Sequence, residues 1–237
     1  MKIKTTALVA AVTLLSGTAA LAAESTSLFT GADTRDDSNY FYLGGIKAIS
    51  GDLDQSGWLL RGVVGYGEYE YQTTAVPSGE VDVDQLSVQA GVGYQRVVDD
   101  TRLSFFTSVD YQDHDDSPAD VMNSVRGDET GVAFQAEIDT TSGDWNYGVM
   151  ASYSTAFDSY WSRARVGYNT GSVTVGPELV VSGNEEYAEE RYGVFVGWPL
   201  SAQTSVTLSG GYFESEGDLS IREEDGGYAS LGLSYQF

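Results

Sequence analysis

Cysteine is absent from this chain of 237 residues, and histidine occurs once, at His114. In an exported protein, the absence of cysteine excludes a disulfide framework, so backbone pairing and packing must hold the fold together. The apolar stretch ALVAAVTLL near the N-terminus is too short to span a bilayer, and no helical pattern of comparable length follows it. Any histidine-dependent chemistry must use His114.

Basic residues are scarce, because 12 lysines and arginines stand against 35 aspartates and glutamates, a formal net charge of −23. Such an acidic surface repels nucleic acid and anionic lipid, which argues against a nucleic-acid partner. The acids are concentrated in a few segments, and the stretches between them are nearly free of charge. The acidic segments are TRDDSN, PSGEVDVD, DYQDHDDSPAD, SGNEEYAEE and ESEGDLSIREEDGG.

The first 22 residues have the pattern of an export signal. Lys2 and Lys4 form a basic start, an apolar centre follows, and Ala20-Leu21-Ala22 is a small-residue cleavage site. We therefore expect residues 1–22 to be a signal peptide that is removed, and residues 23–237 to form one all-β domain or barrel. Loss of the two lysines leaves 10 basic residues against 35 acidic ones and moves the formal charge from −23 to −25.

Segments of alternating apolar and polar residues follow one another along the mature chain. In VAFQAEI (132–138) and LSVQAGVGY (86–94), alternate residues fall on an apolar and a more polar face, which is typical of strands. The chain ends in the same way, with ASLGLSYQF (229–237). The pattern predicts about 12 strands, near residues 27–34, 38–49, 57–71, 84–97, 101–111, 129–140, 144–154, 159–169, 172–182, 189–199, 203–213 and 227–237.

The connections favour a transmembrane antiparallel up-and-down β-barrel over a soluble β-sandwich, whose strands alternate in the same way. VVDD, TSGD, NTGS and LSAQ are short, whereas the acidic loops between them are mostly longer. Outer-membrane barrels have short periplasmic turns and long extracellular loops, and an even number of strands places both termini on the periplasmic side. We therefore predict a barrel in the bacterial outer membrane, in contact with lipid and lipopolysaccharide.

Aromatic residues on the apolar face fall at two heights, which predicts the two aromatic girdles of a membrane barrel. So many exposed rings would make a soluble surface aggregate. The C-terminal strand carries Tyr235 and ends in Phe237, and it resembles the terminal signal that the barrel assembly machinery reads. The girdle near the short turns comprises Trp58, Tyr94, Trp145, Tyr168, Trp198 and Tyr235, and the girdle near the long loops comprises Tyr66, Tyr111, Tyr153, Tyr160, Tyr192 and Tyr212.

Two of the few basic residues, with one residue between them, lie in the predicted strand YWSRARVGYN, residues 160–169. An arginine that faces lipid at mid-depth costs about 2 to 4 kcal/mol, so we expect Arg163 and Arg165 to face the interior, together with Trp161. A two-residue turn at Thr170-Gly171 would then place Arg163 directly opposite Glu178. The sequence therefore predicts a charge network across the lumen, made by Arg61, Asp110, Glu137, Arg163, Arg165 and Glu178.

This network has two interpretations. Paired charges hold the wall of a small barrel together, or they line a path for a polar solute. Many inward positions are glycine, whose bare backbone leaves room in the lumen, although glycine also relieves strain where a barrel bends. These glycines are Gly65, Gly67, Gly91, Gly93, Gly148, Gly167, Gly176, Gly193, Gly211 and Gly232.

Several segments resemble one known family. VDYQDHDDSPAD, the following VRGDE, the strand YWSRARVGY, the tripeptide GPE and SGNEEY together resemble the bacterial cellulose biosynthesis protein BcsS family, from about Leu28 to Phe237. The resemblance implies an outer-membrane protein that acts in the export or surface assembly of a glucan and has no glycosyltransferase activity. The positions that carry it are Tyr111, Gln112, Asp113, His114, Asp115, Pro118, Arg126, Gly127, Tyr160, Trp161, Arg163, Arg165, Gly176, Pro177 and Glu178.

Contact with a neutral glucan requires aromatic faces for the sugar rings and polar groups for the hydroxyls. We expect Trp161 near the outer rim, and a nearby segment in the longest loop, to supply both. The expected contacts are Tyr111, Asp113, His114, Asp115 and Trp161. The resemblance also makes cellulose and other subunits of the cellulose synthase complex candidate partners.

Other functions remain open from the residues alone. Catalysis would have to use His114, with Ser117 or Ser124 as nucleophile, but no nucleophile elbow is present, so we predict a non-catalytic protein without a cofactor. No EF-hand spacing occurs, although the acidic loop offers Asp113, Asp115, Asp116 and Asp120 for weak divalent binding. The alternative functions are a general small-solute channel and a purely structural or adhesive surface barrel.

Overall fold

The computed structural model describes residues 25–217 and 224–237, so the predicted signal peptide at residues 1–22 lies outside the described residues. The described residues form twelve strands, as the alternation predicts. They are β1 (Thr26–Thr34), β2 (Ser38–Ala48), β3 (Gly57–Gln72), β4 (Glu80–Val98), β5 (Thr101–Ser117), β6 (Gly127–Ser142), β7 (Trp145–Ser154), β8 (Tyr160–Asn169), β9 (Thr174–Gly183), β10 (Tyr187–Pro199), β11 (Thr204–Gly217) and β12 (Glu224–Gln236). Within these ranges, no helix has the length and apolar character needed to cross a membrane.

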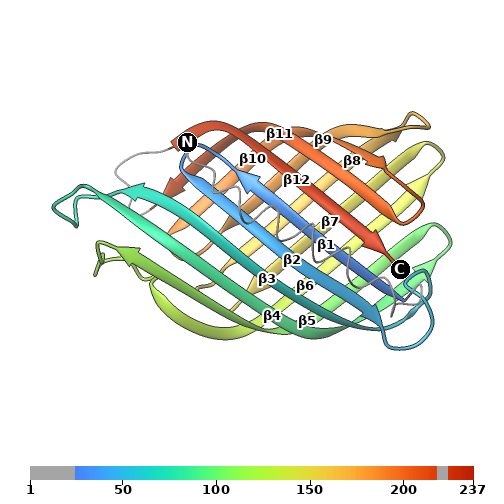
Figure 1. Ribbon diagram of the computed structural model, residues 1–237, viewed down its shortest axis with the longest axis horizontal. Coiled ribbons are helices and arrows are strands. Elements are labelled where there is room, and N and C mark those ends of the chain that lie inside the picture. The colour runs from blue at the N-terminus through green and yellow to red at the C-terminus, as the bar shows by residue number, and fades with distance from the viewer. Residues whose placement is uncertain (1–24, 218–223) are drawn as a thin grey trace.

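The strands close into an up-and-down barrel (Figure 1). Each strand is antiparallel to the next along the chain, and β1 pairs with β12 from Ser27 opposite Gln236 to Thr34 opposite Ala229. The first and last strands therefore form the seam of the barrel. The start of β1 and the end of β12 therefore lie at the same mouth of the barrel, which we call the short-turn end.

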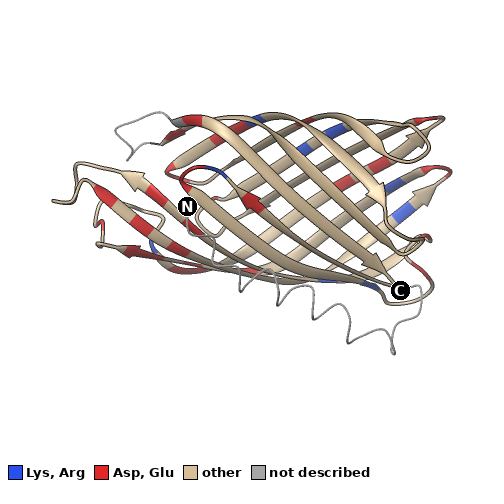
Figure 2. Ribbon diagram, turned by 45° about the horizontal axis from the view of Figure 1, so that its top comes forward, with Lys and Arg blue, Asp and Glu red and all other residues tan. Residues whose placement is uncertain are grey.

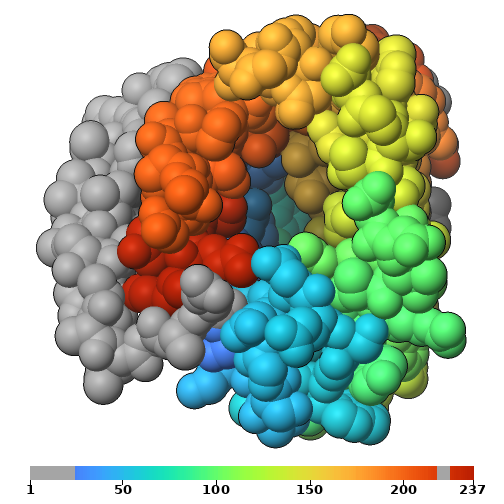
Figure 3. All heavy atoms as spheres, turned by 90° about the vertical axis from the view of Figure 1, so that its right-hand side faces the viewer, coloured from blue at the N-terminus to red at the C-terminus, as the bar shows by residue number. Residues whose placement is uncertain are grey.

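A loop folds inward at the short-turn end, between β2 and β3. Its Leu53 is buried in a small apolar cluster, and the side-chain amide of Gln95 donates hydrogen bonds to the carbonyls of Leu53 and Gln55, at 2.6 and 2.8 Å. Figure 3 views this end and shows a hollow at the centre of the barrel, with this loop in light blue across its lower part. The cluster comprises Leu53, Ala48, Leu59 and Phe106.

The opposite mouth, the long-loop end, is uneven because β3 to β6 have 16 to 19 residues whereas β7, β8 and β9 have 10 each. The longer strands project beyond the rest of the barrel (Figure 1) and carry many of the acidic residues (Figure 2). We expected Glu80, Asp82, Asp113, Asp115 and Asp116 in loops, and this was wrong, because these acids lie in β4 and β5. Val81 and Val83 alternate with the acids and pack inward against Tyr69 and Tyr71, so the segment has two different faces and pairs as strand.

The outward face of the barrel is apolar and aromatic. Near the short-turn end, Trp58 packs edge-on against Tyr94 and Trp145 against Tyr168, with ring centroids 5.4 and 5.1 Å apart. Towards the long-loop end, exposed tyrosine hydroxyls donate hydrogen bonds to acidic side chains. These pairs are Tyr66 with Asp84, Tyr153 with Asp158, Tyr192 with Glu190 and Tyr212 with Asp225. The outward rings thus fall at the two expected heights.

Candidate functional site

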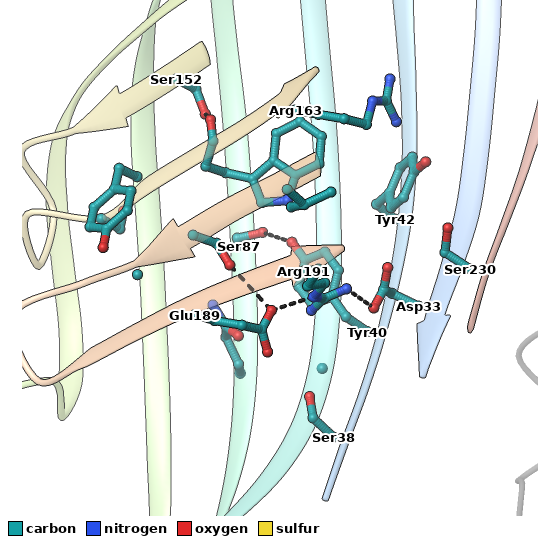
Figure 4. Close-up of a pocket in the computed structure, with 18 of the residues that line it drawn as sticks. Asp33, Ser38, Tyr40, Tyr42, Ser87, Ser152, Arg163, Glu189, Arg191 and Ser230 are labelled. Carbon is teal, nitrogen blue, oxygen red and sulfur yellow. Dashed lines mark hydrogen bonds and ion pairs between the residues drawn. The ribbon is translucent and has the colours of Figure 1, made fainter. Parts of the chain in front are cut away.

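The inward faces of the strands enclose a cavity of about 730 Å³ along the lumen. Its lining combines polar and charged side chains with several aromatic rings and aliphatic groups. The cavity extends from β2 and β4 on one side to β8 and β10 on the other (Figure 4). Residues used below that line it include Asp33, Tyr40, Tyr42, Arg61, Glu137, Trp161, Arg163, Arg165, Glu178, Glu189, Arg191, Tyr228 and Ser230.

The predicted ion pair involves the wrong arginine. Arg165 lies directly opposite Glu178 and forms a salt bridge with it, whereas Arg163 lies opposite Val180. The cause is the turn between β8 and β9, which is longer than two residues. Thr170 bonds back to Val173, with its backbone N–H 2.9 Å from the carbonyl oxygen, so the register differs by two residues from the predicted one.

Glu178 is the centre of a buried group of polar side chains. The residue is 5% exposed, and its carboxylate accepts hydrogen bonds from Arg165, from the Tyr228 hydroxyl at 3.1 Å and from the Ser209 hydroxyl at 3.3 Å. Arg165 also donates to Ser209 Oγ at 2.9 Å, and its guanidinium lies over the Phe195 ring. These contacts join β8 and β9 to β11 and β12, which are not their neighbours in the sheet.

A second charge network, which the sequence analysis did not predict, lies towards the long-loop end. Arg191 of β10 bonds both Glu189 on its own strand and Asp33 of β1. Arg35, in the connection between β1 and β2, also bonds Glu189 and lies 2.8 Å from Asp37. Figure 4 shows Asp33, Arg191 and Glu189 in line across the cavity wall. Because β10 and β1 are separated by β11 and β12, the network bridges the seam from the lumen side.

The sequence carries part of the signal for this network. Glu189 and Arg191 alternate with outward residues in YAEERYG, so both were placeable on the inward face. Their partners are distant in the chain, because Arg35 lies 154 residues from Glu189 and Asp33 lies 158 residues from Arg191. Only closure of the barrel brings these side chains together.

Three other residues of the predicted network lie on the wall formed by β3, β5 and β6 and form no ion pair with the described residues. They are Arg61, Asp110 and Glu137. Arg61 donates to Gln89 at 3.1 Å and lies over the Phe106 ring, 5.7 Å from its centroid. Glu137 accepts a hydrogen bond from Gln135. Asp110 is fully buried and accepts a hydrogen bond from Gln112 at 2.8 Å. The ion pairs in the lumen thus lie on the wall from β8 through β12 to β1, whereas the charged groups on the wall of β3, β5 and β6 are separate.

The expected glucan contacts on β5 are divided between the two faces of the strand. Tyr111, Asp113 and Asp115 alternate with the buried Gln112 and His114, so they face outward, away from the lumen. The prediction that this segment is a loop beside Trp161 was wrong, because the ladder between β5 and β6 continues from Thr101 to His114. Only His114 faces inward, 2% exposed.

His114 is held in an aromatic environment. Its Nδ1 lies 3.2 Å from the Tyr69 hydroxyl, and its ring packs edge-on against Phe157, with centroids 5.1 Å apart. Its Nε2 is buried without a hydrogen-bond partner. Neither Ser117 nor Ser124 contacts this ring, and Ser124 instead donates to Glu185, at 3.1 Å. The described residues around His114 therefore do not form the pair of nucleophile and base that hydrolysis requires.

The four acids considered for divalent binding do not converge on one point. Asp113 and Asp115 face outward, whereas Asp116 and Asp120 are buried. Asp116 accepts a hydrogen bond from the backbone N–H of Asp120, at 3.0 Å, and Asp120 accepts one from the Tyr71 hydroxyl, at 3.2 Å. In the part of the chain that the structure describes, no group of three or more histidine, aspartate or glutamate side chains is arranged to hold a metal ion.

Trp161 and Arg163 lie where the alternation placed them, on the inward face of β8. The Arg163 guanidinium stacks over the Trp161 ring, 5.3 Å from its centroid. Figure 4 shows the Arg163 side chain extending into the cavity towards Tyr42 of β2. Arg163 forms neither a hydrogen bond nor an ion pair with the residues that the structure describes.

We expected the inward glycines to leave free space in the lumen. At many of them this was wrong, because aromatic side chains from other strands fill the space beside them. An added Cβ at Gly65 would lie 2.5 Å from Cζ of Tyr40, and one at Gly193 would lie 3.0 Å from Cζ of Tyr228. These glycines therefore provide seats for rings, a known way to shield glycine in a sheet. The same relationship holds for Gly31 with Tyr42, Gly93 with Phe106 and Gly167 with Phe195.

The C-terminal aromatic residues lie together at the short-turn end. The rings of Tyr235 and Phe237 pack edge-on, with centroids 4.6 Å apart. The backbone N–H of Phe237 donates to the carbonyl of Thr26 at 2.9 Å, so the last residue extends the seam between β12 and β1.

Solved structures with the same fold place the chain in a structural class. It matches the CymD monoaromatic hydrocarbon channel with a TM-score of 0.50 and 9% identity, over 91% of this chain and 89% of that one. It matches the KdgM porin in complex with disordered oligogalacturonate with a TM-score of 0.47 and 10% identity, over 89% of this chain and 99% of that one. It matches outer membrane phospholipase A from Escherichia coli with a TM-score of 0.45 and 11% identity, over 90% of this chain and 92% of that one. At such identities the likeness shows the fold alone, that of the outer-membrane β-barrels.

The sequence places it more narrowly. A family model described as cellulose biosynthesis protein BcsS matches residues 27–237, so the chain belongs to that family, as the resemblance in its motifs implied. The match covers all twelve strands except the first residue of β1. No curated protein matches the chain.

Proposed function

We propose that this protein is a bacterial outer-membrane barrel that acts in cellulose production, at the export or surface assembly of the glucan, and catalyses no reaction itself. The family match over residues 27–237 is the observation that carries the proposal. The lumen supports it, because aromatic rings and uncharged polar groups face a cavity of about 730 Å³. A neutral polysaccharide is bound by such a combination of faces and hydrogen-bonding groups.

Membrane insertion is supported by the outward face. Large apolar side chains such as Phe105 and Val109 are more than half exposed there, which a surface in water does not favour over so wide an area. We place both termini in the periplasm, after export by the signal peptide, with the long-loop end outside the cell. Lipid and lipopolysaccharide then contact the outer wall, and Tyr235 and Phe237 serve as the signal for the barrel assembly machinery.

Two features support a non-catalytic role. The single histidine is buried between Tyr69 and Phe157, with no serine in contact with it. The inward acids Glu178 and Glu189 are bonded to arginines and hydroxyls, so they are committed to the wall. We infer that cellulose and subunits of the cellulose synthase complex are partners, and that nucleic acid is not.

The test is a strain that lacks this gene, in which secreted and cell-retained cellulose are measured together with synthase activity in isolated membranes. The proposal expects secreted cellulose to fall while synthase activity persists. Unchanged amount and location of cellulose would overturn it.

A second candidate is a general small-solute channel. The hollow visible from the short-turn end (Figure 3) and the cavity along the lumen favour it. Conductance of the purified barrel in a planar bilayer separates the two. A steady ion current that cello-oligosaccharides do not block supports the general channel, and a current that they block supports the glucan route.

A further inference from the structure

Four polar groups that line one region of the cavity have no hydrogen-bond or ion-pair partner among the residues that the structure describes. They are the indole N–H of Trp161, the guanidinium of Arg163, and the hydroxyls of Tyr42 and Ser230. None of them forms a side-chain hydrogen bond or an ion pair with the described residues. Figure 4 shows Arg163, Tyr42 and Ser230 around the same part of the cavity. The region lies between β8 on one side and β12 and β2 on the other.

The lack of partners at Arg163 contrasts with the paired arginines on β8, β10 and the connection between β1 and β2. There, Arg165, Arg191 and Arg35 each bond a carboxylate, and Glu178 and Glu189 are at most 5% exposed. The three other arginines along this wall are therefore each paired with a carboxylate. Arg163 lies two residues before the paired Arg165, on the same face of β8, yet its guanidinium stacks on the indole ring of Trp161.

The chemistry of the four groups fits a sugar. An indole face packs against the C–H face of a pyranose, and a guanidinium offers a fork of N–H donors to adjacent hydroxyl oxygens. A tyrosine or serine hydroxyl both donates and accepts, as sugar hydroxyls do. Arg163 also interacts electrostatically with Glu137 and Asp139 of β6, which is separated from β8 only by β7. This interaction offsets the charge of Arg163 and disfavours a strongly anionic ligand.

We propose that Trp161, Arg163, Tyr42 and Ser230 form a subsite in the lumen for one glucose residue of a neutral glucan chain. This inference rests on the proposed function for the identity of the sugar, and it goes further by placing the glucan inside the barrel. Trp161 supplies the stacking face, and Arg163 binds a pair of sugar hydroxyls. Tyr42 and Ser230 form the opposite side of the subsite.

The test is binding of cellohexaose to the purified, folded barrel in detergent. A variant with Trp58, Trp145 and Trp198 replaced by phenylalanine keeps Trp161 as its single tryptophan. The subsite predicts a saturable change in its fluorescence when cellohexaose is added. This variant leaves the lumen intact, so the test does not depend on whether a lumen mutant folds.

Calorimetric titration of cellohexaose then assigns the residues. We expect Trp161→Ala to abolish measurable binding and Arg163→Gln to weaken it about tenfold, because a hydrogen bond to a charged group is lost. Trp145→Ala is the matched control, since that ring lies on the outward face, and it should bind like the parent protein. Equal affinity of the parent and both lumen variants would overturn the subsite, as would no fluorescence change at any concentration.

Two further outcomes separate the subsite from the proposed function. If loss of the gene reduces cellulose secretion but cellohexaose leaves Trp161 unaffected, the subsite is wrong and the proposed function stands. If cellohexaose binds at Trp161 while loss of the gene leaves cellulose unchanged, the role in cellulose production is wrong. Binding of an acidic oligogalacturonate ten times tighter than cellohexaose would contradict a site for a neutral glucan.

Discussion

Arg165 and Glu178 face each other across β8 and β9 and form a buried ion pair inside the lumen. The carboxylate also accepts hydrogen bonds from Tyr228 and Ser209, which belong to strands on the other side of β10. A buried charge of this kind is tolerated because its partners satisfy it, and removal of one partner leaves the other uncompensated. Wall strands that are not neighbours in the sheet are thereby tied together.

We predict strong energetic coupling between these two residues. Replacement of Arg165 by glutamine or Glu178 by glutamine should each lower the free energy of unfolding by about 3 kcal/mol, and the double variant should lose less than the sum. Urea unfolding of the barrel in lipid vesicles, followed by tryptophan fluorescence, measures the coupling. The same cycle with Arg163 in place of Arg165 is the control and should show little coupling, and equal coupling in both cycles would contradict the register.

The network across the seam leads to a second prediction. Glu189 is 2% exposed and accepts bonds from both Arg35 and Arg191, so Glu189→Gln should destabilise the barrel by about 3 kcal/mol. Glu190, the next residue, faces outward and bonds Tyr192, so Glu190→Gln should cost less than about 1 kcal/mol. The temperature at which the folded form is lost on a gel reports both. A similar loss for the two variants would argue against a role in the seam.

Inward glycines that seat aromatic rings should not tolerate even alanine. Gly65→Ala would force the Tyr40 ring away from its site and break its 2.8 Å hydrogen bond to Ser87, at a cost of about 1 to 3 kcal/mol. At Gly232, also inward, the nearest atom to an added Cβ is 3.9 Å away, so alanine there should be nearly neutral. Unfolding of the two variants in parallel tests the difference, and equal stability would show that the ring does not occupy this place.

The stability of the projecting strands should depend on pH through His114. About 9 to 11 residues of a strand cross a bilayer, so His114, near the far end of the 17-residue β5, lies beyond the membrane. Burial lowers the pKa of His114 to about 4 from its ordinary value near 6.5. A histidine with a depressed folded-state pKa favours the fold above pH 6.5, and this contribution is lost as the pH falls from 6.5 to 4.

The expected loss over this range is about 3 kcal/mol, because one pKa unit corresponds to about 1.4 kcal/mol. Hydrogen exchange of β5 amides between pH 4 and pH 7, corrected for intrinsic rates, measures the local stability. His114→Gln is the control and should remove most of the dependence on pH in this window. If His114→Gln keeps the full dependence of stability on pH, the dependence comes from the surrounding carboxylates and not from His114.

The sequence by itself determined which side chains face the lumen. Covalent geometry makes side chains alternate along a strand, so Trp161, Arg163, Arg165 and Glu178 could be assigned to one face from their spacing. The same alternation predicted twelve strands and the two heights of outward aromatic rings. Where alternation continued through acidic segments, in β4 and β5, charge was mistaken for a loop.

Only the tertiary structure decided which inward side chains meet. The turn at Thr170 to Val173 sets the register, and a difference of two residues keeps every side chain on its face while it changes every partner. Closure of the barrel brings Arg191 to Asp33 across the seam, and the curvature of the sheet lays rings over glycines of other strands. The face of a strand on which a side chain lies is a local property of the backbone, whereas contact between side chains across the lumen depends on the position of all twelve strands.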